Sequence, residues 1–341
     1  MKWISKAFYV VNVLVFFLMI ASCLSLYLDP SSSQLLVLLG ASFPIFLLLN
    51  CLFIFYWLVI EPKRIFLSII ALLVCFKSVK SLINYSGSSS TDKSGLSLLS
   101  YNIGGTFFLP YAEREERMKW IPKEISNVNP DIIAFQESSM VQFIKDDLLE
   151  YESHYFTNAG TSLFSKLPIL DKGKLTFGGT INSGAWIDVK TGGQRIRIYS
   201  VHLQSNKISS SEIKALNDLN RNYEDNIKES RNVFSKYSEK SKVRIAQTKL
   251  LLEQIAKSPY PVVVLGDFNE PSFTYIYKKM TQNLDDSFLK KGSGLGTTLN
   301  GKIPFLRIDY AFVDKQIEVL KHEVLDWELS DHFPILVRVK S

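Results

Sequence analysis

Hydrophobic residues divide the 341-residue chain into an apolar N-terminal part and a mixed remainder. No charged residue occurs from Ala7 to Leu28 or from Gln34 to Ile60, and both stretches are rich in Leu, Phe and Ile. Because a helix needs about 20 apolar residues to cross a bilayer, both qualify as transmembrane helices. A third stretch, from Ile65 to about Asn84, is apolar only in its first part, since Lys77 and Lys80 interrupt the rest.

Two alternatives compete with a membrane anchor. A cleaved signal peptide would explain the first stretch, but that stretch is long, and more apolar sequence follows it without a convincing small-x-small cleavage site. Buried core helices would explain any one stretch, but three in succession argue against them. We therefore predict an anchor over residues 1–84 with three transmembrane helices, at about 7–28, 35–60 and 65–84.

The positive charges between these stretches predict an orientation. Lys2 and Lys6 precede the first helix and Lys63–Arg64 precede the third, whereas the first connection contains no Lys or Arg. Positive loops face the cytoplasm, so a multi-pass protein with three helices would carry its remainder outside the cytoplasm. Lys77 and Lys80 argue against this orientation.

The remainder of the chain alternates between strand-like and helix-like segments. Residues 85–94 are polar and rich in Gly and Ser, which predicts a linker. From Gly95 to residue 341, short apolar runs alternate with charged stretches such as Tyr111–Asn127 and Val243–Ile255. This alternation predicts one large α/β or α+β domain over residues 95–341.

The stretch P-V-V-V-L-G-D-F-N-E-P, residues 261–271, organises this domain. Its apolar run predicts a strand buried on both faces, and Gly266 lets the backbone turn. Asp267 and Asn269 follow at a spacing of two, which places both side chains on one side of an extended chain. Such a pair suits a hard cation or a phosphate oxygen, although Asp and Asn also follow strands as simple turn formers.

Several other predicted strands also end in a polar group suited to metal or phosphate chemistry. These groups are Asn102, Glu137, His202, Asp309 and the Asp331–His332 pair. Taken singly, each has a structural explanation: a helix-start acid, a turn, a core histidine, or an aspartate paired with Arg307. Their recurrence at strand ends favours a common site.

Charge and cysteine content narrow the chemistry. Residues 1–84 hold six of the 39 Lys and Arg residues and two of the 33 Asp and Glu residues, which leaves 33 basic and 31 acidic residues, a net charge of +2, in the rest. This near balance gives no strong electrostatic support for nucleic-acid binding. Cys23, Cys51 and Cys75 all lie in the apolar stretches, so the predicted domain has no disulfide framework and no cysteine metal site.

The order of the motifs Y-N-I, A-F-Q-E, S-V-H-L, G-D-F-N, R-I-D-Y and S-D-H-F-P resembles the endonuclease/exonuclease/phosphatase (DNase I-like) superfamily, as a membrane-anchored bacterial-type member. The resemblance covers residues from about 95 to 340. It implies an α+β fold: a four-layered α/β/β/α sandwich with two mixed sheets face to face and the site at one end. About three transmembrane helices would precede this fold.

The resemblance also implies roles for the residues at the strand ends. Glu137 matches the main Mg²⁺ ligand, with Asn102 beside it, and Asp331 matches a second acid near the metal. Mn²⁺ is a possible substitute for Mg²⁺. Such a cation would stabilise the charge that develops on phosphoryl oxygens.

The catalytic roles follow from the same motifs. Asp267 and Asn269 match the pair that positions the attacking water and the phosphate, and Asp267 is the candidate base. His332 matches the catalytic histidine, which Asp309 orients. His202 matches a histidine that contacts phosphate or assists the leaving group. Arg307 could reach the substrate phosphate or pair with a surface acid.

These expectations predict a membrane-anchored, Mg²⁺-dependent phosphohydrolase. A domain tethered close to lipid favours a phosphodiester in a phospholipid or sphingolipid head group as the substrate. The alternative is an extracytoplasmic endonuclease or exonuclease acting on DNA or RNA. A catalytically silent membrane scaffold is a remote third possibility, because the residues that it could lose are all present. The sequence predicts no oligomeric state.

Overall fold

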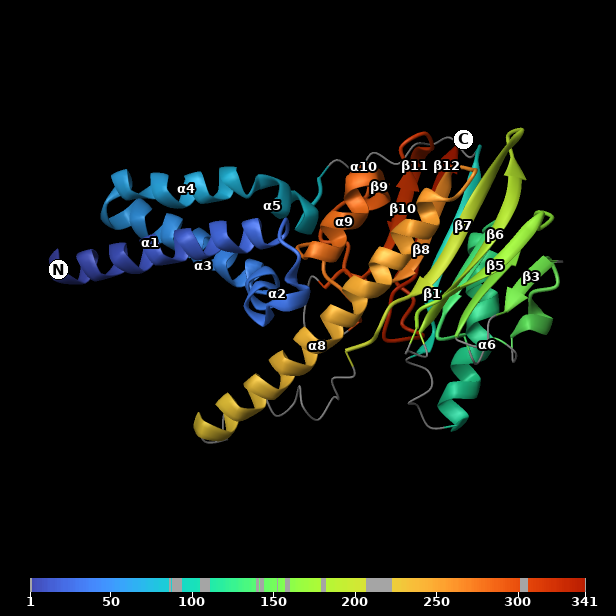
Figure 1. The fold of residues 1–341 in the computed structure, drawn as a ribbon, viewed down its shortest axis with the longest axis horizontal. Helices are drawn as coiled ribbons and strands as arrows, with labels where there is room; N and C mark the ends of the chain where they lie inside the picture. The colour runs from blue at the N-terminus through green and yellow to red at the C-terminus, as the bar shows by residue number, and fades with distance from the viewer. Residues whose placement is uncertain are drawn as a thin grey trace. The chain divides into compact units, whose positions relative to one another are not determined.

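In the computed structural model, the chain forms two compact units (Figure 1). The structure describes residues 2–85, 87, 94–104, 111–138, 141, 144–151, 153–156, 160–178, 182–206, 223–300 and 306–340. The helical unit comprises Met1–Leu82, Ser205–Ile245 and Pro271–Lys279, and the sheet unit comprises Ile83–Gln204, Ala246–Glu270 and Met280–Ser341. The helical unit thus takes in segments beyond residues 1–84, and the predicted anchor, linker and domain boundaries stay predictions.

Apolar helices make up most of the helical unit. They are α1 (Lys2–Ser25), α2 (Gln34–Ala41), α3 (Phe43–Ile60), α4 (Ile65–Val74) and α5 (Phe76–Leu82), with the short 3-10 turns η1 (Pro30–Ser32) and η2 (Pro62–Arg64) between them. The stretches Trp3–Ser25 and Phe43–Ile60 are long and apolar enough to cross a membrane. Large apolar side chains such as Leu14 and Phe55 are exposed on them. This exposure indicates membrane association, because water would disfavour so apolar a surface.

Two of the three predicted transmembrane helices are interrupted. The one predicted at 35–60 breaks at Ser42, where α2 ends and α3 begins with Pro44 in its first turn. The proline ring would clash with the carbonyl four residues earlier, so the helix restarts there. The one predicted at 65–84 bends by 70° between α4 and α5. Among its described residues the helical unit therefore has two candidate spans, or three if this bent pair counts as one.

Hydrogen bonds between buried polar side chains join three of these helices. Trp57 Nε1 of α3 donates a hydrogen bond to Asn12 Oδ1 of α1, and Asn12 Nδ2 donates to Ser68 Oγ of α4, both at 2.9 Å. All three side chains are fully buried. In an apolar surrounding an unpaired amide or hydroxyl costs free energy, so these bonds favour one packing of the helices.

The first six-stranded sheet of the sheet unit has the order β11-β12-β1-β2-β4-β3. Its strands are β1 (Leu96–Asn102), β2 (Ile132–Gln136), β3 (Ser153–Phe156), β4 (Thr161–Ser165), β11 (Glu318–Val324) and β12 (Ile335–Lys340). β1 runs parallel to β2, and the other neighbours are antiparallel. The sheet is therefore mixed, as the resemblance implied.

The second six-stranded sheet has the order β5-β6-β7-β8-β10-β9. Its strands are β5 (Asp171–Thr176), β6 (Ser183–Thr191), β7 (Gln194–His202), β8 (Val262–Asp267), β9 (Leu284–Asp286) and β10 (Asp309–Asp314). β7 and β8 are parallel, and the other pairs are antiparallel. The run of valines in β8 is buried along its whole length, which confirms the predicted strand buried on both faces.

The two sheets share one apolar core between their inner faces. Leu98 and Ile132 of the first sheet belong to the same buried cluster as Ile198 and Val263 of the second. Alternate residues of each strand point to opposite faces, so Leu99 and Ile133 are left to the outer face. There they pack with residues of α6 (Tyr111–Val128) in a second cluster.

A long helix also contacts the second sheet. Tyr199 Oη of β7 donates a hydrogen bond to the Gln254 carbonyl of α8 (Tyr223–Ala256) at 3.4 Å. The shorter helices are α9 (Tyr275–Asn283) and α10 (Ser287–Lys291), with the 3-10 turn η5 at Lys145–Asp147. Two sheets flanked by helices confirm the predicted α+β sandwich. The helix predicted at Val243–Ile255 is the last part of α8, and residues 207–222 before it lie outside the described residues.

Candidate active site

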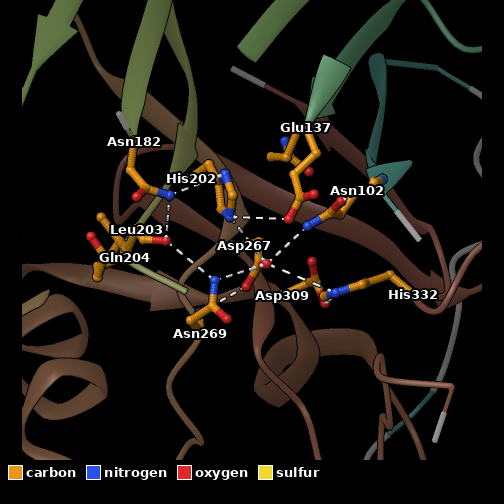
Figure 2. A network of polar contacts seen from close by, with 12 residues as sticks. Asn102, Glu137, Asn182, His202, Leu203, Gln204, Asp267, Asn269, Asp309 and His332 are labelled. Carbon is orange, nitrogen blue, oxygen red and sulfur yellow. Dashed lines mark hydrogen bonds and ion pairs between the residues drawn. The ribbon is translucent and has the colours of Figure 1, made fainter. Parts of the chain in front are cut away.

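Three neighbouring strands of the second sheet bring their site residues into register. His202 at the end of β7 lies opposite Asp267 at the end of β8, and Asp267 lies opposite Asp309 at the start of β10. Gly266 permits this close pairing: its φ is +142°, and a Cβ there would lie 2.0 Å from the Val201 carbonyl oxygen. The three side chains therefore meet because the strands align (Figure 2).

The parallel pair of the first sheet delivers two more site residues. Asn102 is paired with Gln136 where β1 and β2 end, and Glu137 follows directly. Glu137 has a φ of +50°, a left-handed conformation that is unfavourable for a non-glycine residue. Gly104 makes room for its side chain, because a Cβ on Gly104 would lie 1.9 Å from Glu137 Oε2. The backbone is thus shaped around this carboxylate.

The Asp267 carboxylate is the centre of the hydrogen-bond network in Figure 2. Its Oδ1 accepts from the Asn269 backbone N–H at 2.7 Å. Its Oδ2 accepts from the amides of Asn102 at 2.9 Å and Asn269 at 3.0 Å. Asn269 also has a φ of +52°, which turns the chain back toward Asp267. These donors hold both oxygens of a buried carboxylate in one orientation.

The groups around Asp267 have opposing effects on its pKa. Burial raises the pKa of Asp267 to about 6, and the charge of Asp309 adds to the rise, whereas His332 and His202 oppose it. At neutral pH the group is ionised, yet it binds a proton far more readily than an ordinary aspartate does. This is the property expected of a general base.

His332 lies between two carboxylates. Its Nδ1 is 2.9 Å from Asp309 Oδ2, and its Nε2 is 3.9 Å from Asp267 Oδ2. Burial alone would lower the pKa of His332, but the negative charges of Asp309 and Asp267 outweigh it and raise this pKa to about 10. The imidazole is therefore a cation at neutral pH, able to donate a hydrogen bond to an anionic oxygen.

His202 reaches the same centre from the other side. Its Nε2 lies 3.6 Å from Glu137 Oε1 and 3.8 Å from Asp267 Oδ2. Its Nδ1 contacts the Asn182 amide at 3.3 Å. Burial lowers the pKa of His202, although Asp267 opposes the shift. The two histidines thus differ, one cationic and the other neutral near pH 7.

The oxygen donors of the site fit a hard divalent cation. The Glu137 side chain is 39% exposed, so its carboxylate borders solvent, and Asn102 is its hydrogen-bond partner. Burial raises the pKa of Glu137, an unfavourable setting for a lone anion that a bound cation would relieve. One carboxylate with a carboxamide oxygen is the type of donor set with which proteins hold Mg²⁺.

A second group of side chains could also hold a metal ion. Asp267, Asp309 and His332 offer ligand atoms that all lie within 4.8 Å of one another. His332 Nδ1 is already engaged with Asp309, however, and Mg²⁺ prefers an all-oxygen set. Two sets of side chains could therefore hold a metal ion: Glu137 with Asn102, and Asp267 with Asp309 and His332.

Two of the residues singled out in the sequence lie apart from this network. Asp331 is exposed, and its Oδ1 lies 3.2 Å from Ser330 Oγ. Its charge still raises the pKa of His332 and Glu137. Arg307 is buried and forms a 2.8 Å ion pair with Asp286, also buried. The acid that pairs with Arg307 is thus an interior one, and a contact of Arg307 with substrate phosphate stays a prediction.

Other residues of the site were not anticipated from the sequence. Asn182 precedes β6 and contacts His202. Thr298 Oγ1 accepts from the Asp309 backbone N–H at 3.1 Å, and Ser330 Oγ donates to the Asn102 carbonyl at 2.9 Å. A polar residue directly before a strand was the only signal for Asn182. Ser330 is the first residue of the S-D-H-F-P motif but was given no role, and Thr298 gives no signal of its own, because ordinary loops are rich in such residues.

Comparisons with solved structures agree with this fold. Solved structures with the same fold include an endonuclease/exonuclease/phosphatase family protein from Bacteroides thetaiotaomicron (TM-score 0.55, 19% identity, 72% of this chain and 97% of that chain). D. rerio TDP2 complexed with a single-strand DNA product is similar too (TM-score 0.54, 17% identity, 73% of this chain and 100% of that one). So is the B. thetaiotaomicron mannosyl-6-phosphatase (TM-score 0.53, 18% identity, 72% and 100%). No curated protein matches the sequence.

A sandwich with acids and histidines gathered where its strands end defines a phosphoester hydrolase. The chain belongs to the Endonuclease/Exonuclease/phosphatase family, whose model matches residues 99–332. Metal dependence is typical of that family. A second family, described as a domain of unknown function, matches residues 5–82, the apolar helices.

Proposed function

We propose that this protein is a membrane-anchored, Mg²⁺-dependent phosphodiesterase that hydrolyses the head group of a phospholipid or sphingolipid. The contact between Asp267 and His332 carries the proposal, because it sets a carboxylate that can accept a proton beside a protonated imidazole. Glu137 and Asn102 supply oxygen donors next to this pair. Base, cationic donor and metal ligands are the parts that phosphoester hydrolysis needs.

Each residue has a distinct part in this proposal. Mg²⁺ held by Glu137 and Asn102 would stabilise negative charge on the phosphoryl oxygens. Asp267 accepts a proton from the attacking water, whose oxygen bonds to phosphorus as the bond to the leaving oxygen breaks. His332 donates a hydrogen bond to a phosphoryl oxygen. The leaving oxygen takes up a proton, so the net reaction adds water across one P–O bond.

The supporting residues keep these groups in place. Asn269 and Asn102 orient Asp267 through three hydrogen bonds from two amides and one backbone N–H. Asp309 holds His332 by its Nδ1, so that Nε2 faces Asp267. Fixed donors and acceptors of this kind need no reorganisation during the reaction, which is how a preorganised site lowers a barrier.

The exposed apolar helices favour a lipid substrate. Two candidate spans precede the sheet unit in the chain, and a tether of this kind keeps an enzyme close to lipid. A nuclease is the second candidate, because D. rerio TDP2, which has this fold, is known in complex with single-strand DNA. The near-neutral charge of residues 85–341 gives no electrostatic support for it.

A substrate panel tests the proposal. The full-length protein, reconstituted in vesicles, would be given phosphatidylcholine, sphingomyelin, single- and double-stranded DNA, and mannose 6-phosphate, each with Mg²⁺ or with EDTA. We expect Mg²⁺-dependent release of a lipid head group, and loss of this release in Asp267→Asn. Degradation of DNA with every lipid untouched would replace the lipid assignment by the nuclease. Failure to hydrolyse even bis-nitrophenyl phosphate would favour the catalytically silent membrane scaffold.

A further inference from the structure

Asn182 occupies a buried position beside the candidate site, directly before β6. Its Nδ2 lies 3.3 Å from His202 Nδ1 and 3.1 Å from the Leu203 carbonyl oxygen. The side chain is 6% exposed. Figure 2 shows the amide between these two partners, on the far side of the His202 ring from Glu137. One amide thus contacts a site histidine and the residue next to it.

The Leu203 carbonyl decides which way this amide points. A carbonyl oxygen can only accept, so the amide nitrogen of Asn182, not its oxygen, must face Leu203. The reversed amide would place two acceptor oxygens against each other. Because the same nitrogen faces His202 Nδ1, its second hydrogen points to that ring atom. Nδ1 is therefore the acceptor, and the neutral ring carries its proton on Nε2.

The Leu203 peptide group is itself held by hydrogen bonds to Asp267 and Asn269. Its N–H donates to the Asp267 backbone carbonyl at 2.9 Å, and its carbonyl also accepts from Asn269 Nδ2 at 3.2 Å. The reference point that orients Asn182 is therefore tied to Asp267 and Asn269. A change in the Asn182 amide would therefore affect His202 first.

The proton placed on Nε2 faces the reactive space. Within the described part of the chain, Nε2 is buried and has no hydrogen-bond partner. It lies 3.6 Å from Glu137 Oε1 and 3.8 Å from Asp267 Oδ2, outside hydrogen-bonding distance of both. An N–H group left without a partner is costly, so it is suited to an acceptor that arrives with the substrate.

We propose that Asn182 is a positioning residue that fixes His202 as its Nε2–H tautomer, so that His202 offers the site a neutral hydrogen-bond donor and not a proton acceptor. The acceptor is an anionic oxygen of the phosphoester, and this part of the proposal rests on the proposed function. His202 and His332 then divide their tasks. One gives a neutral donor and the other a cationic donor, and Asp267 is left as the base.

The tautomer can be observed without substrate or turnover. The full-length protein in detergent micelles, labelled with ¹⁵N in its four histidines, would be examined by long-range ¹H–¹⁵N NMR at neutral pH. A His202→Gln variant assigns the His202 signals. We expect the wild-type ring to show a protonated Nε2 and an unprotonated Nδ1. A protonated Nδ1 with a bare Nε2 would overturn the proposal.

Asn182→Asp supplies the sharper comparison, because it keeps the shape and replaces the donor by an acceptor. His202 should then gain a proton on Nδ1 and become a cation, as His332 does beside Asp309, and kcat should fall by about 10–100-fold, the usual effect of changing an orienting partner, with KM little changed. In Asn182→Leu neither tautomer is enforced, so the two should coexist. His322, whose Nδ1 contacts Ser287 Oγ at 2.8 Å, is the internal reference and should not change.

The outcomes separate the two proposals. If His202 remains an Nε2–H tautomer in both Asn182 variants, Asn182 does not position it. If the tautomer follows Asn182 but no phosphoester is hydrolysed, the proposed function fails and the role of Asn182 stands. Should Asn182→Asp not fold, the wild-type spectrum and Asn182→Leu still decide.

Discussion

Nε2 of His332 lies 3.9 Å from Oδ2 of Asp267, and the same imidazole is held from behind by Asp309, 2.9 Å from its Nδ1. β8 and β10 pair the two aspartates directly, whereas the histidine comes from the loop before β12. The result is a cation between two anions in a buried place. Most of the expected pH dependence follows from this arrangement.

Asp309→Asn should lower the alkaline limit of activity. The Asp309 charge helps to raise the pKa of His332 to about 10, so the wild-type enzyme should stay active until the pH approaches that value. Without the charge His332 loses its proton at lower pH, and the falling limb of a kcat–pH profile should move down. Asp326→Asn, on the surface, is the matched control. A limb that does not move would exclude His332 as the cationic donor.

The same pair should make stability depend on pH. The folded-state pKa of His332 is raised above its ordinary 6.5, so its contribution is complete below pH 6.5 and is lost as pH rises through about 10. The unfolding temperature of the wild type should therefore fall toward that of Asp309→Asn across this interval. Thermal unfolding at several pH values measures the difference, and a constant difference would contradict the assignment.

Asp267 should set the acid limit. Burial raises its pKa to about 6, and a base must be ionised to accept a proton, so kcat should decrease about tenfold per pH unit well below pH 6. In Asp267→Asn the residual rate, if measurable, should lose this dependence. Equal wild-type rates at pH 7 and pH 5 would show that another group accepts the proton.

Glu137→Gln should weaken metal binding while the fold is retained. The substitution removes the charge of the candidate ligand but keeps its shape, and Mn²⁺ titration followed by electron paramagnetic resonance reports binding without an assay of activity. We expect a loss of affinity of about 10–100-fold, taking the effect of outer-shell changes as a lower guide. Glu150→Gln is the control, because that side chain is 62% exposed and paired with Lys166. Equal Mn²⁺ affinity in both variants would place the metal elsewhere.

Gly104→Ala should impair the site through Glu137 alone. The added methyl would lie 1.9 Å from Glu137 Oε2 and 2.3 Å from its Cδ, so the carboxylate must move. Mg²⁺ dependence should shift to higher concentration, with a smaller change in unfolding temperature. Gly178→Ala is the matched control, since nothing lies within 4 Å of a Cβ at that position. If both variants respond alike to Mg²⁺, Gly104 does not serve Glu137.

A cysteine introduced at an exposed position tests the extracytoplasmic orientation that the positive charges predict. The native cysteines are Cys23, Cys51 and Cys75, all within the apolar stretches, so the sheet unit offers a clean background. Lys174→Cys should react with a membrane-impermeant maleimide in intact cells. Lys63→Cys, at an exposed position in the positively charged turn before α4, should react only after lysis. The opposite pattern would place the site in the cytoplasm.

Part of the site was predictable because a polar residue follows each apolar strand directly in the sequence. Apolar runs followed by a polar residue located Asn102, Glu137, His202 and Asp267, and the structure brings these four together. Asp331 and Arg307 have equally suggestive neighbours in sequence, but one is exposed and the other is committed to Asp286. Local sequence cannot separate these outcomes, because each depends on a partner distant in the chain.

The apolar helices likewise have some features that the sequence predicted and one that it did not. Length and hydrophobicity predicted helices at about 7–28 and 35–60, which overlap the candidate spans Trp3–Ser25 and Phe43–Ile60, because both properties depend only on composition. The 70° bend between α4 and α5 was not predicted. Side-chain packing decides whether a marginal apolar stretch continues straight, and packing is not visible in hydropathy.

The sequence by itself determined an α/β or α+β domain, the family resemblance that implied the sandwich, and the kinds of chemical group available, because apolar periodicity and short motifs are local properties. Only the tertiary structure decided which nitrogen of each histidine faces the centre, and how strongly each proton is held. Asn182 beside His202 and Asp309 beside His332 are contacts between separate strands and loops. Protonation depends on burial and on charges a few ångströms away, and both exist only once the chain has folded.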